Sequence, residues 1–215
     1  MQTGSGETGG AAAARRPIAE RSAPWAVALA ARLARSRVTP NQISLASVAF
    51  AAAGAALIGL LPHPVAWLAA AACIQLRLLC NLLDGMVAIE GGKQSAVGPI
   101  YNDAPDRVAD SLVLIAAGYA VALPWLGWAA ALLAVATAYV RVLGGSVGLE
   151  QSFAGIMSKR RRMDALTLGL AAAAAETWAL SSHHSLAAVL AVIAAGSLWT
   201  CVTRTADIAR RLRRA

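Results

Sequence analysis

Charged residues are scarce in this sequence. Asp, Glu, Lys and Arg make up 14% of the 215 residues, whereas 58% are hydrophobic. The mean hydropathy is +0.59, which excludes an ordinary soluble domain and is typical of a chain with several membrane spans. Segments of alternating polarity are also missing, and their absence excludes a transmembrane barrel of strands.

Cysteine is nearly absent as well. The three cysteines, Cys73, Cys80 and Cys201, all fall inside apolar stretches, and their spacing does not fit a zinc site. We interpret them as small packing residues, because free cysteine is among the most buried residue types. The sequence therefore indicates neither a disulfide framework nor a zinc centre.

What the sequence does contain is long apolar runs. A span needs about 20 mainly apolar residues, and six such stretches are present, at 44–61, 65–83, 107–123, 125–143, 163–180 and 186–203. They predict an all-α fold, a bundle of six transmembrane helices. We expect one membrane domain over 21–205, preceded by a disordered tail at 1–20 and followed by a basic tail at 206–215.

The basic residues are distributed unevenly along the chain. The formal net charge is +8, yet none of the 19 Lys and Arg residues lies in the first, third or fifth connection, at 61–64, 122–127 and 176–185. This is the positive-inside bias. It predicts a multi-pass protein of the cell inner membrane with both termini in the cytoplasm. The basic excess therefore indicates the bilayer as a partner and argues against nucleic acid.

A short segment before the first stretch has a helical pattern. Trp25, Leu29 and Leu33 recur near helical spacing among basic residues, which predicts an amphipathic helix in the cytoplasmic interface. A plain leader to the first span is the alternative. Pro40 is expected to end this helix, and Asn41 to cap the next one.

Acidic and amide residues gather at the expected cytoplasmic ends of the second and third stretches. Asn81 and Asp84 are three residues apart, and Asn102, Asp106 and Asp110 are four apart. These spacings place each set on one helix face, provided that the third helix begins by about residue 100. Carboxylate and amide oxygens suit a hard cation such as Mg²⁺, Mn²⁺ or Ca²⁺. The alternative is a set of solvated acids that pair with nearby Arg or Lys.

These residues resemble the signature of the CDP-alcohol phosphatidyltransferase family, D-x2-D-G-x2-A-R-x8-G-x3-D-x3-D. The corresponding residues here are Asn81, Asp84, Gly85, Ala88, Ile89, Gly98, Asn102 and Asp106, and every spacing holds. The likeness covers roughly 22–205, including the number of spans and the interfacial helix. This chain departs from the signature in having Asn at the first and third Asp positions and Ile at the Arg position.

The resemblance implies a role for each matching position. The metal ligands would be Asn81, Asp84, Asn102 and Asp106, with Asp103 and Asp110 as candidates to compensate for the two amides. They would hold one or two Mg²⁺ or Mn²⁺ ions, and Asp106 would also be the general base. Candidate nucleotide and phosphate contacts are Gly85, Ala88, Gly98, Lys93 and Arg77. Candidate acceptor contacts are Arg141, Arg161 and Arg162.

The function implied is transfer of a phosphatidyl or phospho-alcohol group from a CDP-linked donor, such as CDP-diacylglycerol, to an alcohol or phosphorylated alcohol, with release of CMP. Arg77 and Arg141 have an alternative, an ion pair with Asp84. For the chain as a whole there are two alternative functions. One is a catalytically degenerate binding or scaffold relative, because two of four aspartates are amides, and the other is a small transporter. The acceptor and the oligomeric state, monomer or homodimer, stay open.

Overall fold

A computed structural model describes residues 23–93 and 97–214, and within these ranges every regular element is a helix. The helices are α2 Pro24–Ala34, α3 Pro40–Leu60, α4 Pro64–Glu90, α5 Gly98–Ala120, α6 Pro124–Ser146, α7 Lys159–Leu180 and α8 His184–Leu212. The all-α prediction is confirmed for this part of the chain. The tail expected at 1–20 lies outside the described residues.

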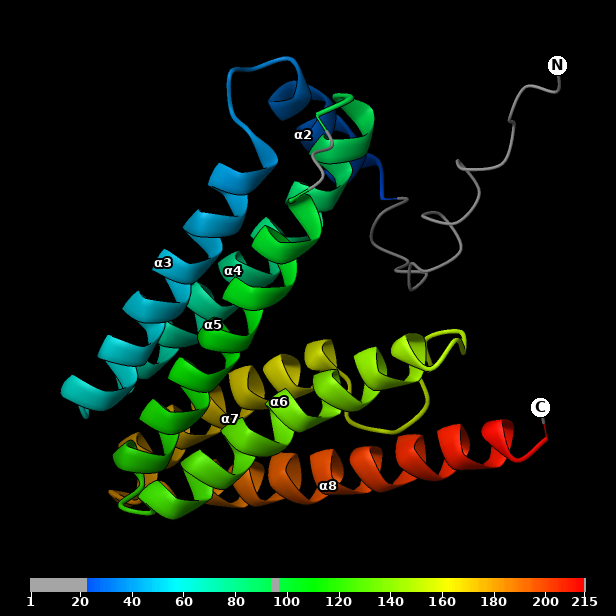
Figure 1. Ribbon diagram of the computed structural model, residues 1–215. Coiled ribbons are helices and arrows are strands. Elements are labelled where there is room, and N and C mark those ends of the chain that lie inside the picture. The colour runs from blue at the N-terminus through cyan, green and yellow to red at the C-terminus, as the bar shows by residue number, and fades with distance from the viewer. Residues whose placement is uncertain (1–22, 94–96, 215) are drawn as a thin grey trace, which may run out of the picture.

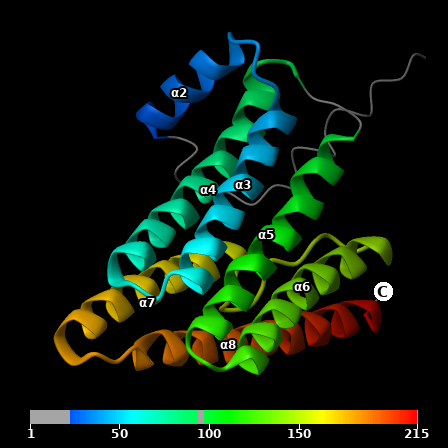
Figure 2. The same ribbon diagram turned by 90° about the vertical axis from the view of Figure 1, so that its left-hand side faces the viewer.

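The long helices form two groups. Helices α3, α4 and α5 lie together, and α6, α7 and α8 form a second group that crosses the first steeply (Figure 1). The view turned by 90° shows the same division (Figure 2). Contacts between α5 and α6 and between α4 and α7 join the two groups. Polar side chains on α4, α5 and α7 are therefore brought together where the groups meet.

Of the helices in the described ranges, four are long and apolar enough to cross a membrane, namely α3, α4, α6 and α8. The sequence predicted six spans, and α5 and α7 are not among the four. Both of these helices carry at least three charged residues in their N-terminal halves, which lowers their hydropathy. The helices also extend beyond the apolar stretches: α4 continues to Glu90, and α5 begins at Gly98. Helical geometry thus continues into the polar zone, where the acidic residues lie.

Local sequence explains where the helices begin. Proline occupies the first turn of α2, α3, α4 and α6, a position where its missing N–H costs nothing. The expected cap at Asn41 is wrong. Thr39 is the N-cap of α3 and forms a capping box with Gln42, so Asn41 lies inside the first turn, next to Pro40.

Two glycines allow α5 and α6 to approach closely. A Cβ at Gly118 would lie 2.6 Å from the Cα of Gly127, and a Cβ at Gly127 would lie 2.8 Å from the backbone oxygen of Leu114. Neither distance is compatible with a side chain. Small residues are common at such contacts between apolar helices, and here they fix α5 against the second group.

Helix α2 packs on α4. Its buried residues, Ala26 and Ala30, belong to a small cluster with Leu83 and Val87 of α4, while Trp25 is 55% exposed. The expected helix therefore exists, with a small-residue face against the bundle. Its location at a membrane surface stays a prediction.

Candidate active site

The facing ends of α4 and α5 bring the predicted residues together. Nδ2 of Asn81 on α4 donates a hydrogen bond of 2.9 Å to Oδ1 of Asp106 on α5. Asp84, one turn further along α4, is also buried. The side chain of Asn102 lies outside the described residues. The two helix faces expected from the spacing therefore do meet.

Asp84 is held by a hydroxyl group of helix α3. It is 3% exposed, and its Oδ2 accepts a hydrogen bond of 2.7 Å from Oγ of Ser44 on α3. Its Oδ1 is buried and has no hydrogen-bond partner. Within the described residues Asp84 forms no ion pair. A buried carboxylate with an unpartnered oxygen is costly unless a cation binds it, so this residue fits a metal ligand.

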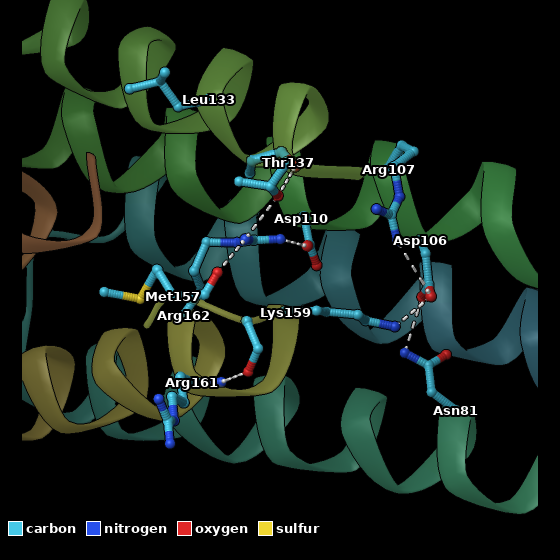
Figure 3. A network of polar contacts seen from close by, with 12 residues as sticks. Asn81, Asp106, Arg107, Asp110, Leu133, Thr137, Met157, Lys159, Arg161 and Arg162 are labelled. Carbon is cyan, nitrogen blue, oxygen red and sulfur yellow. Dashed lines mark hydrogen bonds and ion pairs between the residues drawn. The ribbon is translucent and has the colours of Figure 1, made fainter. Parts of the chain in front are cut away.

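Asp106 has very different neighbours. Lys159 Nζ contacts its Oδ2. Nη2 of Arg77 lies 3.5 Å from Oδ1, and Nη2 of Arg107 lies 3.8 Å from Oδ2. Figure 3 shows Asn81, Lys159 and Arg107 all pointing toward this carboxylate. Both oxygens of Asp106 are therefore engaged by donors of the chain itself.

Asp110, one turn further along α5, belongs to a buried ion network. Its Oδ1 lies 2.5 Å from Nη2 of Arg77, and its Oδ2 lies 3.3 Å from Nη2 of Arg162. Arg162 also donates to Thr137 Oγ1 at 3.1 Å and to the Met157 carbonyl at 3.3 Å (Figure 3). The network joins α4, α5, α6 and α7. Each of these partners prevents a costly unpaired buried charge.

Helix α8 holds in place the loop that leads into Lys159. Gly155 has φ +104°, and a Cβ there would lie 2.4 Å from Thr200. The N–H of Met157 donates to Thr200 Oγ1 at 3.0 Å, and Arg204 donates to the Ala154 carbonyl at 2.8 Å. Ser158 then caps α7. Lys159 thus follows directly after a loop with a constrained backbone.

The remaining candidate residues surround this centre. Nη2 of Arg141 lies 3.2 Å from Oδ1 of Asp103, and the side chain of Asp103 is 49% exposed. Lys93 donates to the carbonyls of Ser36 and Val38 at 2.7 and 3.0 Å, so it ties the end of α4 to the α2–α3 loop.

The other predicted contacts lie at the same end of the bundle. Arg161 donates to the Ile156 carbonyl at 2.9 Å. Gly85 and Ala88 lie on α4, and Gly98 begins α5. The alternative of an ion pair with Asp84 is wrong for both Arg77 and Arg141, because their partners are on α5.

A cavity of about 300 Å³ opens beside Asn81 and Lys159, two of the residues that contact Asp106. Trp25 of α2 and apolar residues of α4, including Leu78 and Leu82, form one part of its lining, and Asn81 and Lys159 form another. The cavity therefore joins an apolar wall to the polar centre. This shape suits a molecule with an apolar portion and a charged headgroup.

Two residues of this site were missed in the sequence. Ser44 begins an apolar run, and Lys159 is the first of four consecutive basic residues. Within this run we predicted Arg161 and Arg162 as acceptor contacts, and not Lys159. The hydroxyl of Ser44 contacts one buried carboxylate, and the ammonium group of Lys159 contacts another. Both contacts join segments that are far apart in the sequence, so local spacing does not reveal them.

Searches for related proteins point to one family. No family model matches the chain. It is 34% identical over 187 residues to the archaetidylinositol phosphate synthase of Aeropyrum pernix, covering 86% of this chain and 91% of the relative. It is 26% identical over 181 residues to the inner membrane protein YnbA of Escherichia coli, covering 82% and 87%.

Solved structures agree at the level of fold. The phosphatidylinositol phosphate synthase of Mycobacterium tuberculosis with CDP-DAG bound superposes with a TM-score of 0.71 at 20% identity, over 85% of this chain and 92% of that one. The same enzyme in complex with manganese and citrate gives a TM-score of 0.70 at 20% identity, over 85% and 88%.

Fold and site together define a helical, multi-pass membrane protein with oxygen-bearing side chains gathered between two groups of helices. The chain belongs to the CDP-alcohol phosphatidyltransferase family. It is a membrane-embedded transferase of phospholipid biosynthesis.

Proposed function

We propose that the chain transfers a phosphatidyl-type group from a CDP-linked lipid to a phosphorylated polyol of the inositol phosphate kind, and releases CMP. The names of the Aeropyrum relative and of the Mycobacterium enzyme support this acceptor class. The observation that carries the proposal is the free buried oxygen of Asp84, adjacent to the hydrogen bond between Asn81 and Asp106.

A divalent cation, Mg²⁺ or Mn²⁺, is part of the proposal. The residues that would hold it are Asp84, whose Oδ1 has no partner among the described residues, and the amides of Asn81 and Asn102. Both oxygens of Asp106 are engaged by donors of the chain, so we keep Asp106 as the general base alone. When bound, the ion would neutralise charge on the donor diphosphate. The complex of the Mycobacterium enzyme with manganese supports the choice of metal. Asp103 and Asp110 have arginine partners, so we assign them no ligand role.

The reaction itself requires one base and one leaving group. The hydroxyl oxygen of the acceptor attacks the phosphorus that carries the lipid, and its proton passes to the carboxylate of Asp106. The bond between that phosphorus and the bridging oxygen breaks, and CMP leaves with the electron pair. Gly85, Ala88 and Gly98 would line the nucleotide, with Lys93 at its edge. Arg77, wholly buried against Asp110, would position Asp106.

Acceptor binding is assigned to partly exposed cations. Arg141 contacts Asp103 and its side chain is 25% exposed, and Arg161 is exposed two residues after Lys159. A guanidinium group suits bidentate contact with a phosphate. Arg162 is 1% exposed in its side chain, so we give it the task of orienting Asp110. The cavity beside Trp25 would receive the apolar part of the donor.

For the topology we propose that α5 and α7 cross the membrane together with the four apolar helices. Both termini and the carboxylate site would face the cytoplasm of the inner membrane, and α2 would lie in the interface. The absence of Lys and Arg from three alternate connections supports this orientation. Soluble acceptor and CMP would then exchange with the cytoplasm.

The test is a CMP-release assay with the full-length protein in detergent and CDP-diacylglycerol as donor. Inositol phosphate, glycerol phosphate, free inositol and serine serve as acceptors. We expect release with inositol phosphate to exceed release with free inositol, because Arg141 and Arg161 bind the acceptor phosphate. Release with neutral alcohols alone would overturn the acceptor class, and no release with any acceptor would favour the scaffold alternative.

A further inference from the structure

One carboxylate of the site is already neutralised by the chain. Oδ1 of Asp106 accepts from Asn81, and Oδ2 is in contact with Lys159. The family signature has an aspartate where Asn81 stands. An aspartate at that position would carry no N–H to donate and would repel Asp106. Compared with the family signature, this chain therefore has one negative charge fewer at position 81, and a positive charge, Lys159, lies close to Asp106.

The balance of charge differs sharply across the site. Asp106 has three cationic neighbours, Arg77, Arg107 and Lys159. Asp84 has an uncharged hydroxyl as its partner and a free Oδ1. A divalent cation is attracted to the Asp84 side. It is repelled on the Asp106 side, where an ammonium group and two guanidinium groups lie within contact distance of one carboxylate.

We propose that Lys159 is a built-in cation that takes the place of a second divalent ion at Asp106. The site then holds one divalent ion, on the Asp84 side, and the Lys159 ammonium supplies the positive charge on the other side. This inference rests on the proposed function and adds the division of labour between ion and lysine. Lys159 is a positioning residue in this account, because it acts on the substrate through Asp106.

The fold holds Lys159 in this place. The preceding loop packs its Gly155 against Thr200 of α8, and Ser158 caps the helix that Lys159 begins. Nε of the neighbouring Arg160 lies 3.5 Å from Oδ2 of Asp164 on the same helix, and Arg160 lines the cavity together with Lys159. A cation outside the site serves better as the control, and Arg210, whose Nη2 lies 3.9 Å from Oδ1 of Asp207 near the end of α8, provides it.

The experiment counts bound ions rather than turnover. Full-length protein in detergent, with CDP present, is titrated with Mn²⁺, and free Mn²⁺ is followed by electron paramagnetic resonance. We expect one ion per chain in the wild type. The double variant Asn81→Asp with Lys159→Met restores a carboxylate and removes the ammonium, so we expect two. Lys159→Met alone should tighten Mn²⁺ binding about tenfold, because a nearby like charge is gone.

The controls are Lys159→Arg, which keeps the charge, and Arg210→Met, which removes a charge near the end of α8. Both should still bind one ion. The inference is overturned if the wild type binds two ions or none. It is also overturned if the double variant elutes as a folded particle and binds one ion. CMP release measured in parallel separates the two proposals. A wild type that releases CMP and binds two ions would contradict the proposed role of Lys159 but not the proposed function. A wild type that releases no CMP would contradict the proposed function.

Discussion

Asp84 on α4 and Asp110 on α5 are both buried carboxylates, and the structure treats them in opposite ways. Asp110 lies between two arginines, with one oxygen bound to each. Asp84 has one hydroxyl donor and an oxygen without a partner. Asp106, between them, has an amide and three cations around it.

The contrast indicates a division of roles among similar residues. A buried acid whose charge is fully matched contributes to the architecture, because its removal strands its partners. A buried acid left partly unmatched is available to a ligand. The unpartnered oxygen of Asp84 therefore indicates ligand binding, and the double ion pair of Asp110 indicates a structural role. The following variants test this contrast.

The largest effect is expected from Asp110→Ala. It leaves Arg77 and Arg162 buried without their carboxylate, so we expect a loss of about 3–5 kcal/mol in the free energy of unfolding. Denaturant unfolding of the protein in detergent measures it. Asp207→Ala is the control, because its ion pair with Arg211 on α8 is partly exposed and should contribute about 0–1 kcal/mol. Equal losses in the two variants would contradict the structural role.

Asp84→Asn should lower activity and leave stability intact, the reverse of Asp110→Ala. The amide oxygen can still accept from Ser44, but the negative charge is gone, so we expect CMP release to fall about 10²–10³-fold. Stability should be unchanged or higher, because an unmatched buried charge has been removed. CMP release and unfolding are measured on the same preparation. Unchanged CMP release, or a loss of stability like that of Asp110→Ala, would remove the distinction between the two acids.

Ser44→Ala sharpens the comparison at a smaller scale. It removes the hydrogen bond of 2.7 Å that orients Asp84, and loss of such a supporting contact typically weakens metal affinity about 10–100-fold. Ser47→Ala is the matched control, because Ser47 is buried on the same helix and donates to the Ser44 carbonyl instead. Mn²⁺ affinity should change in the first variant only. A similar change in both would show that Ser44 acts through helix stability.

The smallest effect is expected from Thr39→Ala. Thr39 caps the first turn of α3, the end of the helix that carries Ser44, and loss of a cap costs about 1 kcal/mol. Thr203→Ala, at an exposed hydroxyl inside α8, should leave the unfolding transition nearly unchanged. If the two variants unfold alike, the capping box does not stabilise the start of α3.

Much of this architecture follows from local pattern. Apolar runs predicted the helices, and the three- and four-residue spacings predicted that Asn81 and Asp106 would face each other, because both are properties of a single helix. The extension of α4 and α5 beyond their apolar runs was underestimated, since hydropathy reports contact with lipid and not helical geometry. Helices α5 and α7 differ from the four apolar helices because charged residues in their N-terminal halves lower the mean hydropathy.

The contacts that distinguish the three acids could not be derived in this way. Ser44 and Asp84 are 40 residues apart, and Lys159 and Asp106 are 53 apart. Which basic residue of 159–162 reaches which carboxylate depends on how α7 crosses α4 and α5. The sequence therefore predicted Asp84, Asp106 and Asp110 as candidate site residues, and the packing of the helices gives each of them its contacts.

The central claim is that a divalent ion beside Asp84 contacts the diphosphate of the donor. Electron–nuclear double resonance on the Mn²⁺-loaded protein with CDP-diacylglycerol measures the coupling between Mn²⁺ and phosphorus directly. We expect a phosphorus coupling in the wild type that is lost in Asp84→Asn. A wild type without this coupling, or an Asp84→Asn variant that retains it, would contradict the account.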